Sequence, residues 1–170
     1  DTWSFTGAAN YNDIASTTIT DTIKKADATV VVTPYDVTYN GQPHTATYTV
    51  NGVNGESGAT VGTVTLNTTH TNAAVYSSDT WSFAGAANYN DIASTTITDT
   101  IKKADATVSV TPYDVTYNGQ PHTATYTVNG VNGESGVTVG PVALTTTHTN
   151  AAVYSSDTWS FTGAANYNDI

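Results

Sequence analysis

The sequence has no cysteine, no methionine and only four basic residues among 170. The absence of cysteine excludes disulfides, thiol chemistry and cysteine-ligated metals. The absence of methionine leads us to expect an internal or processed piece of a longer protein. The basic residues are Lys24, Lys25, Lys102 and Lys103, against 14 acidic residues, which gives a formal net charge of −10. Because nucleic acids and anionic membranes are bound through clustered cations, we expect neither as a partner.

Long apolar runs are missing as well. No stretch approaches the roughly 18 consecutive apolar residues of a membrane-spanning helix, so we expect no membrane insertion. We also expect no signal peptide among these residues.

What the sequence does contain is a repeat. DTWSFTGAANYNDI stands at residues 1–14 and again at 157–170, and DTWSFAGAANYNDI stands at 79–92, so the period is 78 residues. When residues 1–92 are laid over 79–170, seven pairs differ: Thr6/Ala84, Val31/Ser109, Ala59/Val137, Thr63/Pro141, Thr65/Ala143, Asn67/Thr145 and Ala84/Thr162. A fixed period indicates an array of modules. We therefore divide the chain into the C-terminal strands of a partial module (1–25), a complete module (26–103) and a module lacking its final strand (104–170).

Alternating polar and apolar residues, rich in Val, Thr, Tyr and Trp, run through every module. This period of two predicts an all-β fold, and nothing in the sequence predicts a helix. In the complete module we expect strands near residues 28–33, 36–39, 44–53, 59–67, 74–84 and 92–101. Asn40 and Gly41 tolerate positive φ, so we expect a tight hairpin turn at residues 39–42. Pro141 cannot donate to a β-ladder and predicts an edge strand.

The differences between copies indicate which face of each strand is buried. Positions 63, 65 and 67 change whereas Val64 and Leu66 stay, as expected for a strand with one buried face. Alternation in the aromatic strand likewise places Trp81 and Phe83 on one face, which is more often core than a binding surface. The expected structural core is Trp3, Phe5, Trp81, Phe83, Trp159, Phe161, Tyr39, Tyr76, Val64 and Leu66.

The junction between modules has neither Gly nor Pro over IASTTITDTIKKADATVSVT, residues 92–111. A flexible linker would be rich in Gly and Ser, so we expect a stiff junction at Ile101, Lys102, Lys103 and Ala104. We also expect residues 1–25 to pair as closing strands stacked on residues 26–103, in a chain that continues past both ends. The alternative is strand donation between chains, since Ala15–Lys25 repeats the strand that residues 104–170 lack.

Four motifs recur in the modules: KADATV, PYDVTYNGQPH, THTNAAVY and ANYND. They resemble the MBG type of bacterial immunoglobulin-like repeat, which occurs in tandem in very large secreted or surface proteins. The resemblance covers every full or partial module. It implies immunoglobulin-like β-sandwich modules of 78 residues arranged end to end, at an extracellular or cell-surface location, and it implies no catalytic residues because the motifs are structural.

Two sets of residues could carry chemistry. The groups of a Ser-His-Asp triad are present, but no nucleophile turn or oxyanion hole accompanies them, so we expect no enzyme. These residues are His44, His70, Ser77 and Asp79. Oxygen ligands of the kind calcium uses also occur, yet such residues are equally common in turns, so we expect no cofactor and keep calcium as the alternative. These residues are Glu56, Asp79, Asn88, Asn90 and Asp91.

Three surface features have alternative interpretations. Lys102 or Lys103 could form an internal isopeptide bond, but a solvated charge at a strand edge is the simpler interpretation. Exposed aromatic residues could bind carbohydrate; the candidates are Trp81, Phe83, Tyr39, Tyr48, Tyr76 and Tyr89. The threonines could carry O-linked glycans or form a regular ice-binding face, and Asn67 begins an Asn-Thr-Thr sequon that its counterpart Thr145 lacks.

These observations favour a non-enzymatic structural repeat, a segment of a longer tandem array that forms a rigid extracellular stalk or fibre. Its partners would be neighbouring identical modules in the same chain or fibre, with glycans as a further attachment. The alternative is an adhesive module that binds glycan or another surface.

Overall fold

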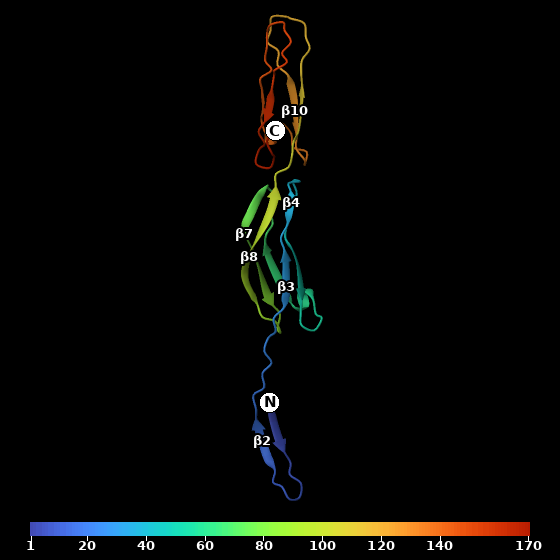
Figure 1. The fold of residues 1–170 in the computed structure, drawn as a ribbon. Helices are drawn as coiled ribbons and strands as arrows, with labels where there is room; N and C mark the ends of the chain where they lie inside the picture. The colour runs from blue at the N-terminus through green and yellow to red at the C-terminus, as the bar shows by residue number, and fades with distance from the viewer.

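Residues 26–103 form two facing β-sheets in the computed structural model, which describes residues 1–170 (Figure 1). One sheet has four strands in the order β4-β8-β7-β6 and the other pairs β3 with β5. All pairs are antiparallel except β4 with β8. The strands are β3 (Thr29–Thr33), β4 (Asp36–Thr38), β5 (Thr47–Asn51), β6 (Gly62–Asn67), β7 (Ala74–Gly85) and β8 (Ile92–Lys102). A 3-10 turn, η1 (Gly58–Thr60), precedes β6. The all-β fold predicted from the alternation is confirmed.

The core of this unit lies between the two sheets. It is built on Val50 from β5, Val61, Phe83 from β7 and Tyr89, all of them buried. Val64 and Leu66 on β6 are half-buried, whereas positions 63, 65 and 67 between them are exposed, which confirms the alternation expected from the differences between copies. Because β6 lies at the edge of the four-stranded sheet, the edge position predicted from Pro141 is also confirmed for its equivalent strand.

Residues 104–170 repeat this arrangement with fewer paired strands. Two separate pairs remain, β9 with β10 and β11 with β12. The elements are β9 (Thr107–Thr111), β10 (Thr125–Asn129), η2 (Gly136–Thr138), β11 (Val142–Leu144) and β12 (Trp159–Phe161). Residues 114–116, which correspond to β4, form no strand, because β4 pairs with β8 alone and β8 has no counterpart among these residues.

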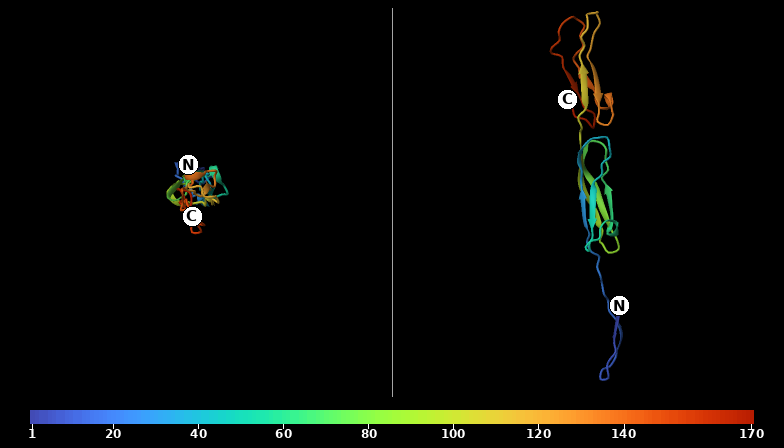
Figure 2. Two further views of the ribbon diagram at one scale, coloured as in Figure 1. Left: turned by 90° about the horizontal axis from the view of Figure 1, so that it is seen from above. Right: turned by 90° about the vertical axis from the view of Figure 1, so that its right-hand side faces the viewer.

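Residues 1–25 contain a two-stranded hairpin of β1 (Thr2–Phe5) and β2 (Ile14–Thr18). The hairpin does not stack on residues 26–103 as expected, because an extended segment separates the two (Figures 1 and 2). Trp3 and Phe5 are 45% and 46% exposed and are therefore not core residues: the hairpin has no facing sheet. Trp159 is also exposed, because no strand covers β12 on the side where β8 covers β7.

The turn at residues 39–42 differs from the expected hairpin. Gly41 does adopt a positive φ of 76°, and Asn40 accepts a hydrogen bond from the Gln42 N–H at 2.9 Å, as in a turn. However, β4 and β5 on either side of it belong to different sheets, so the turn joins the two layers.

No helix in the structure has the length and apolar character needed to cross a membrane.

Candidate functional site

The junction between residues 26–103 and 104–170 brings together parts of the chain that are distant in sequence. Strand β8 ends at Lys102, and two residues later the second unit begins with a hydrogen bond of its own, from the Ala104 N–H to the Asn166 carbonyl at 2.9 Å. A single buried apolar cluster then spans both units, joining Tyr39 and Ile101 from the first to Phe161 and Tyr167 from the second. The two units therefore share a core at the junction.

Tyr39 is the centre of this junction. Its ring meets Tyr167 edge-on at 5.7 Å, and its hydroxyl donates to Glu134 Oε1 at 2.7 Å. This hydrogen bond raises the pKa of Tyr39 to about 12 and, together with the backbone N–H of Glu134 itself, lowers the pKa of Glu134 to about 2. Tyr39 was expected in the core of its own module; it is buried, but against the next one.

Asn166 makes a second set of contacts across the junction. Its side-chain oxygen accepts the Ala73 N–H at 2.8 Å, and its side-chain nitrogen donates to Asn72 Oδ1 at 3.2 Å. Gly41 packs directly against the side chain of Asn132. Two loops of the second unit, residues 130–135 and 162–170, thus converge on two turns of the first, with hydrogen bonds that fix their relative rotation.

The four junction residues predicted from the sequence divide into two kinds. Ile101 and Ala104 are buried in the shared core. Lys102 and Lys103 are exposed, and Lys102 forms an ion pair with Asp36 at 2.8 Å in which both side chains are 61% exposed. Such a surface pair contributes little stability.

The sequence analysis did not identify three further junction residues, Glu134, Asn166 and Tyr167. They lie in loops that are distant in sequence, although the same residue types recur one period earlier at Glu56, Asn88 and Tyr89.

We expect the junction to loosen in acid. Glu134 has a pKa of about 2 in the folded chain against 4.5 for an unperturbed glutamate, so its contribution is complete above pH 4.5 and is lost as the pH falls toward 2. The Ala73 N–H, which donates to the Asn166 side chain across the junction, should lose hydrogen-exchange protection over this range. Tyr39→Phe should reduce the protection of this N–H already at pH 7 and flatten the acid dependence. Equal pH dependence in both proteins would contradict this assignment.

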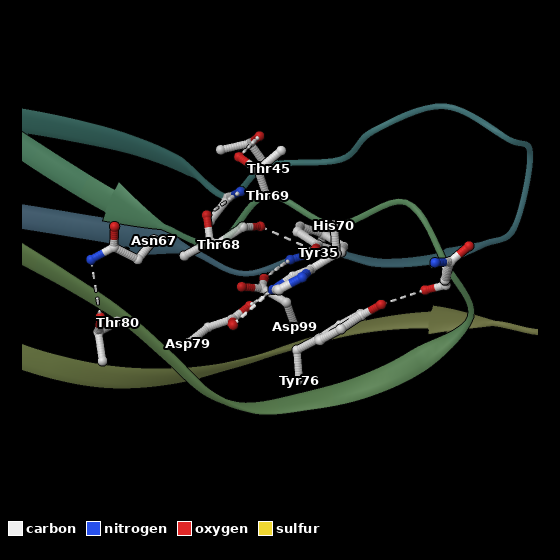
Figure 3. A network of polar contacts seen from close by, with 12 residues as sticks. Tyr35, Thr45, Asn67, Thr68, Thr69, His70, Tyr76, Asp79, Thr80 and Asp99 are labelled. Atoms are coloured by element: carbon white, nitrogen blue, oxygen red, sulfur yellow. Dashed lines mark hydrogen bonds and ion pairs between the residues drawn. The ribbon is translucent and has the colours of Figure 1, made fainter.

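A second polar cluster lies within residues 26–103 (Figure 3). His70 Nε2 contacts Asp79 Oδ1 at 2.8 Å, and the imidazole stacks on the Tyr76 ring at 3.5 Å. Behind them, Asp99 on β8 is fully buried and accepts the Tyr35 N–H at 2.8 Å. The Tyr35 hydroxyl, whose pKa burial raises to about 12, donates to the Thr68 carbonyl at 3.1 Å. The cluster ties β8 to the turn before β4.

Asp99 is the member of this cluster whose burial is least compensated by hydrogen bonds. Burial raises its pKa, and its second oxygen has no partner unless the carboxyl is protonated and donates to Asp79. The pKa of Asp99 is higher in the folded chain than the 3.8 of an unperturbed aspartate. Asp99 therefore stabilises the fold most below pH 3.8, and this stabilisation is lost as the pH rises through the pKa of the folded chain.

Asp99→Asn should therefore stabilise residues 26–103 at neutral pH, because the amide keeps an acceptor for Tyr35 and supplies a permanent donor toward Asp79. The gain in melting temperature should be larger at pH 7 than at pH 4. The matched control is Asp21→Asn, one period earlier and exposed, which should change nothing. A lower melting temperature for Asp99→Asn at pH 7 would contradict this account of the buried carboxyl.

The structure separates most of the other residues singled out from the sequence. Ser77 is exposed and forms no hydrogen bond with His44 or His70, so the three groups of a triad do not assemble. The oxygen ligands considered for calcium serve other contacts: Asp91 accepts the Gly85 N–H, Asn90 donates to Asp27, and Asp79 faces His70. No group of three or more histidine or acidic side chains is arranged to hold a metal ion.

The aromatic residues considered for sugar binding do not form one surface. Phe83, Tyr89 and Tyr39 are buried, Tyr76 stacks on His70, and Tyr48 is 48% exposed on β5. Asn67 is exposed at the end of β6 and donates to Thr80 Oγ1 at 3.4 Å.

Comparison of the chain with known protein families, with curated proteins and with solved structures found no match.

Proposed function

We propose that this chain is a non-enzymatic structural element, a rigid segment of an extracellular stalk or fibre built from immunoglobulin-like β-sandwich modules of 78 residues. The arrangement of strands supports the module type. Strands β6, β7 and β8 form consecutive neighbours of one antiparallel sheet, as strands C, F and G do in immunoglobulin domains, and β3 pairs with β5 in the facing sheet. The extracellular location is consistent with the absence of cysteine and rests on the sequence resemblance.

The observation that carries the proposal is the shared core at the junction. A flexible tether would leave the two units with separate surfaces, whereas here Tyr39 and Ile101 are buried by residues of the next unit. Each unit carries both halves of this contact: Tyr39, Asn72 and Ala73 at one end recur as Tyr117, Asn150 and Ala151, and Glu134, Asn166 and Tyr167 at the other recur as Glu56, Asn88 and Tyr89. A surface that can be repeated along an axis is what a stalk requires.

An adhesive module binding glycan or another surface is the competing function. The scattered aromatic residues give it little support, since a sugar platform needs coplanar exposed rings. A glycan array with the folded chain separates the two functions. Specific and saturable binding to one glycan class would favour adhesion, whereas a structural role predicts none.

Small-angle X-ray scattering tests the structural proposal. The chain should scatter as an extended rod, because its units stack along one axis (Figure 2) and share a core. Insertion of Gly-Gly after Lys103 should broaden the distance distribution, since it separates Ile101 and Ala104, which pack in the same cluster. If the insertion leaves the scattering profile unchanged, the junction contacts do not hold the units in line.

A further inference from the structure

The chain enters residues 26–103 at one end of their long axis and leaves at the other (Figure 1). The point of entry is Ala26, and the point of exit is Lys103, which leads directly into the next unit. Tension along the molecule therefore acts on these two points. The resistance of the unit to such tension depends on how its first segment is bonded to its last.

The first and last segments of this unit run side by side in the same direction. Strand β4 pairs with β8 in parallel, with Val37 opposite Ile101, whereas all other strand pairs are antiparallel. A second parallel contact lies at the point of entry, where Ala26 forms a bridge with Tyr89. The start of the unit is thus joined to its end at two places along the axis.

Main-chain hydrogen bonds hold the contact at the point of entry. The Ala26 N–H donates to the Asn88 carbonyl at 2.8 Å, and the Ala26 carbonyl accepts the Asn90 N–H at 2.9 Å. The Asn90 side chain also donates to Asp27 Oδ1 at 2.7 Å. Strand β8 begins two residues later, at Ile92. The point of entry is therefore bonded to the residues that lead into the last strand.

The contact between β4 and β8 lies near the point of exit. The Thr100 N–H donates to the Tyr35 carbonyl at 2.9 Å, and the Tyr39 N–H donates to the Lys102 carbonyl at 2.8 Å, on either side of the β4 ladder. Ile101, in the middle of the paired part of β8, is 2% exposed. Movement of β4 along β8 must therefore break these bonds and disturb a buried side chain.

Tension along the axis pulls β4 and β8 in opposite directions. It draws β4 toward Ala26 at the lower end of the unit and β8 toward Lys103 at the upper end (Figure 1). Because the bonds of a parallel pair are evenly spaced along both strands, sliding one strand along the other loads all of them together. Strand β3, between Ala26 and β4, is likewise loaded along its length against β5. Strands pulled apart from one shared end would instead lose their bonds one at a time.

We propose that residues 26–103 bear mechanical tension and that the parallel pair of β4 and β8 is the element that resists it. The proposal rests on the proposed function, because a stalk that is held at both ends carries tension along its axis. The ion pair between Lys102 and Asp36 also joins the two strands, but it is solvent-exposed and adds little. The resistance comes from the main-chain ladder and the buried Ile101.

Single-molecule force spectroscopy of the full chain in two attachment geometries tests the proposal. The chain has no cysteine, so introduced cysteine pairs define the points that carry the DNA handles. Lys25→Cys with Lys103→Cys loads β4 and β8 along their length. Gln42→Cys with Lys103→Cys pulls from the turn after β4 and from the end of β8, which lie at the same end of the pair. We expect a rupture force several-fold higher in the first geometry, and equal forces in both would overturn the proposal.

A matched pair of proline variants separates resistance to force from stability. Tyr35 and Tyr39 bond to β8, so Val37 midway between them directs its N–H to β8 as well, and Val37→Pro removes that donor. The control Thr63→Pro removes a main-chain N–H from β6, outside the β4–β8 pair, and the equivalent position already carries Pro141. Val37→Pro should lower the rupture force in the first geometry, whereas Thr63→Pro should leave it unchanged even where both variants lower the melting temperature.

Equal loss of rupture force in the two proline variants would contradict the assignment of the β4–β8 pair. The comparison of attachment geometries needs neither variant, so it decides the proposal even if Val37→Pro does not fold. Failure of either test would leave the stalk function untouched, because that function is tested by scattering from chains under no load.

Discussion

Replacement of Phe83 by alanine is expected to destabilise residues 26–103 by about 3–5 kcal/mol, the cost of emptying a large core site. Phe83 is 2% exposed and lies between the sheets with Val50, Val61 and Tyr89. Its ring packs so closely on Gly62 that even a methyl group there would clash. Small domains have about 5–15 kcal/mol of total stability, so this loss is enough to leave much of the unit unfolded near physiological temperature.

The repeat supplies an unusually good control for this prediction. Phe5 is the same residue in the same motif, but it is 46% exposed, so Phe5→Ala should leave the melting temperature nearly unchanged. Thr65→Ala should also be nearly neutral, since Thr65 is exposed and its counterpart is Ala143. Urea or thermal unfolding followed by circular dichroism measures all three. Equal losses for Phe5→Ala and Phe83→Ala would show that the sheets do not face each other as described.

Gly41→Ala should loosen the junction between the two units while leaving each of them folded. A Cβ at position 41 would overlap the side chain of Asn132 in the next unit. The same substitution strains the turn, because φ is 76° and an alanine there costs about 1 kcal/mol. The expected result is a loss of hydrogen-exchange protection at the Ala73 N–H, which donates to Asn166 across the junction, beyond the loss that turn strain explains.

Gly119→Ala isolates the turn strain from the junction. Gly119 occupies the equivalent turn with a φ of 77°, and the nearest atom to its new Cβ would be the Tyr117 hydroxyl at 3.9 Å. This variant should lose only the local stability of its turn and should keep full protection at the Ala73 N–H. If the two variants affect this N–H equally, the contact between Gly41 and Asn132 does not contribute to the junction.

The strand pattern of the complete unit could be predicted from sequence because local physics decides it. Alternation on β6 identifies Val64 and Leu66 as inward, and every predicted strand of residues 26–103 overlaps an observed one. The aromatic strand shows the limit. Trp3, Trp81 and Trp159 have the same neighbours in sequence, yet Trp81 is half-buried while the other two are exposed. Their burial depends on which other strands are present, and a strand's own sequence does not contain that information.

The junction was located from sequence but its contacts were not. An uninterrupted run around Lys102 and Lys103 indicates stiffness, but those side chains point into solvent. Ile101 and Ala104 of the run do lie in the shared core, but the other residues that join the units include Tyr39, Glu134 and Tyr167, which lie far from the run and from one another in sequence. Loop residues rich in Asn, Gly and Tyr look like ordinary turns until the structure brings two turns together. The aspartate at position 99 was missed for a related reason, because only the fold reveals that it is buried.

The distance between the two units within one chain tests the central claim, a rigid junction, most directly. Thr65→Cys with Ala143→Cys places spin labels at equivalent exposed positions of β6 and β11, and the native chain has no cysteine to interfere. Double electron–electron resonance, measured with excess unlabelled chain, should give one narrow distance distribution. Tyr39→Phe at low pH and the Gly-Gly insertion after Lys103 should broaden it. A broad distribution in the unsubstituted background at neutral pH would contradict the account.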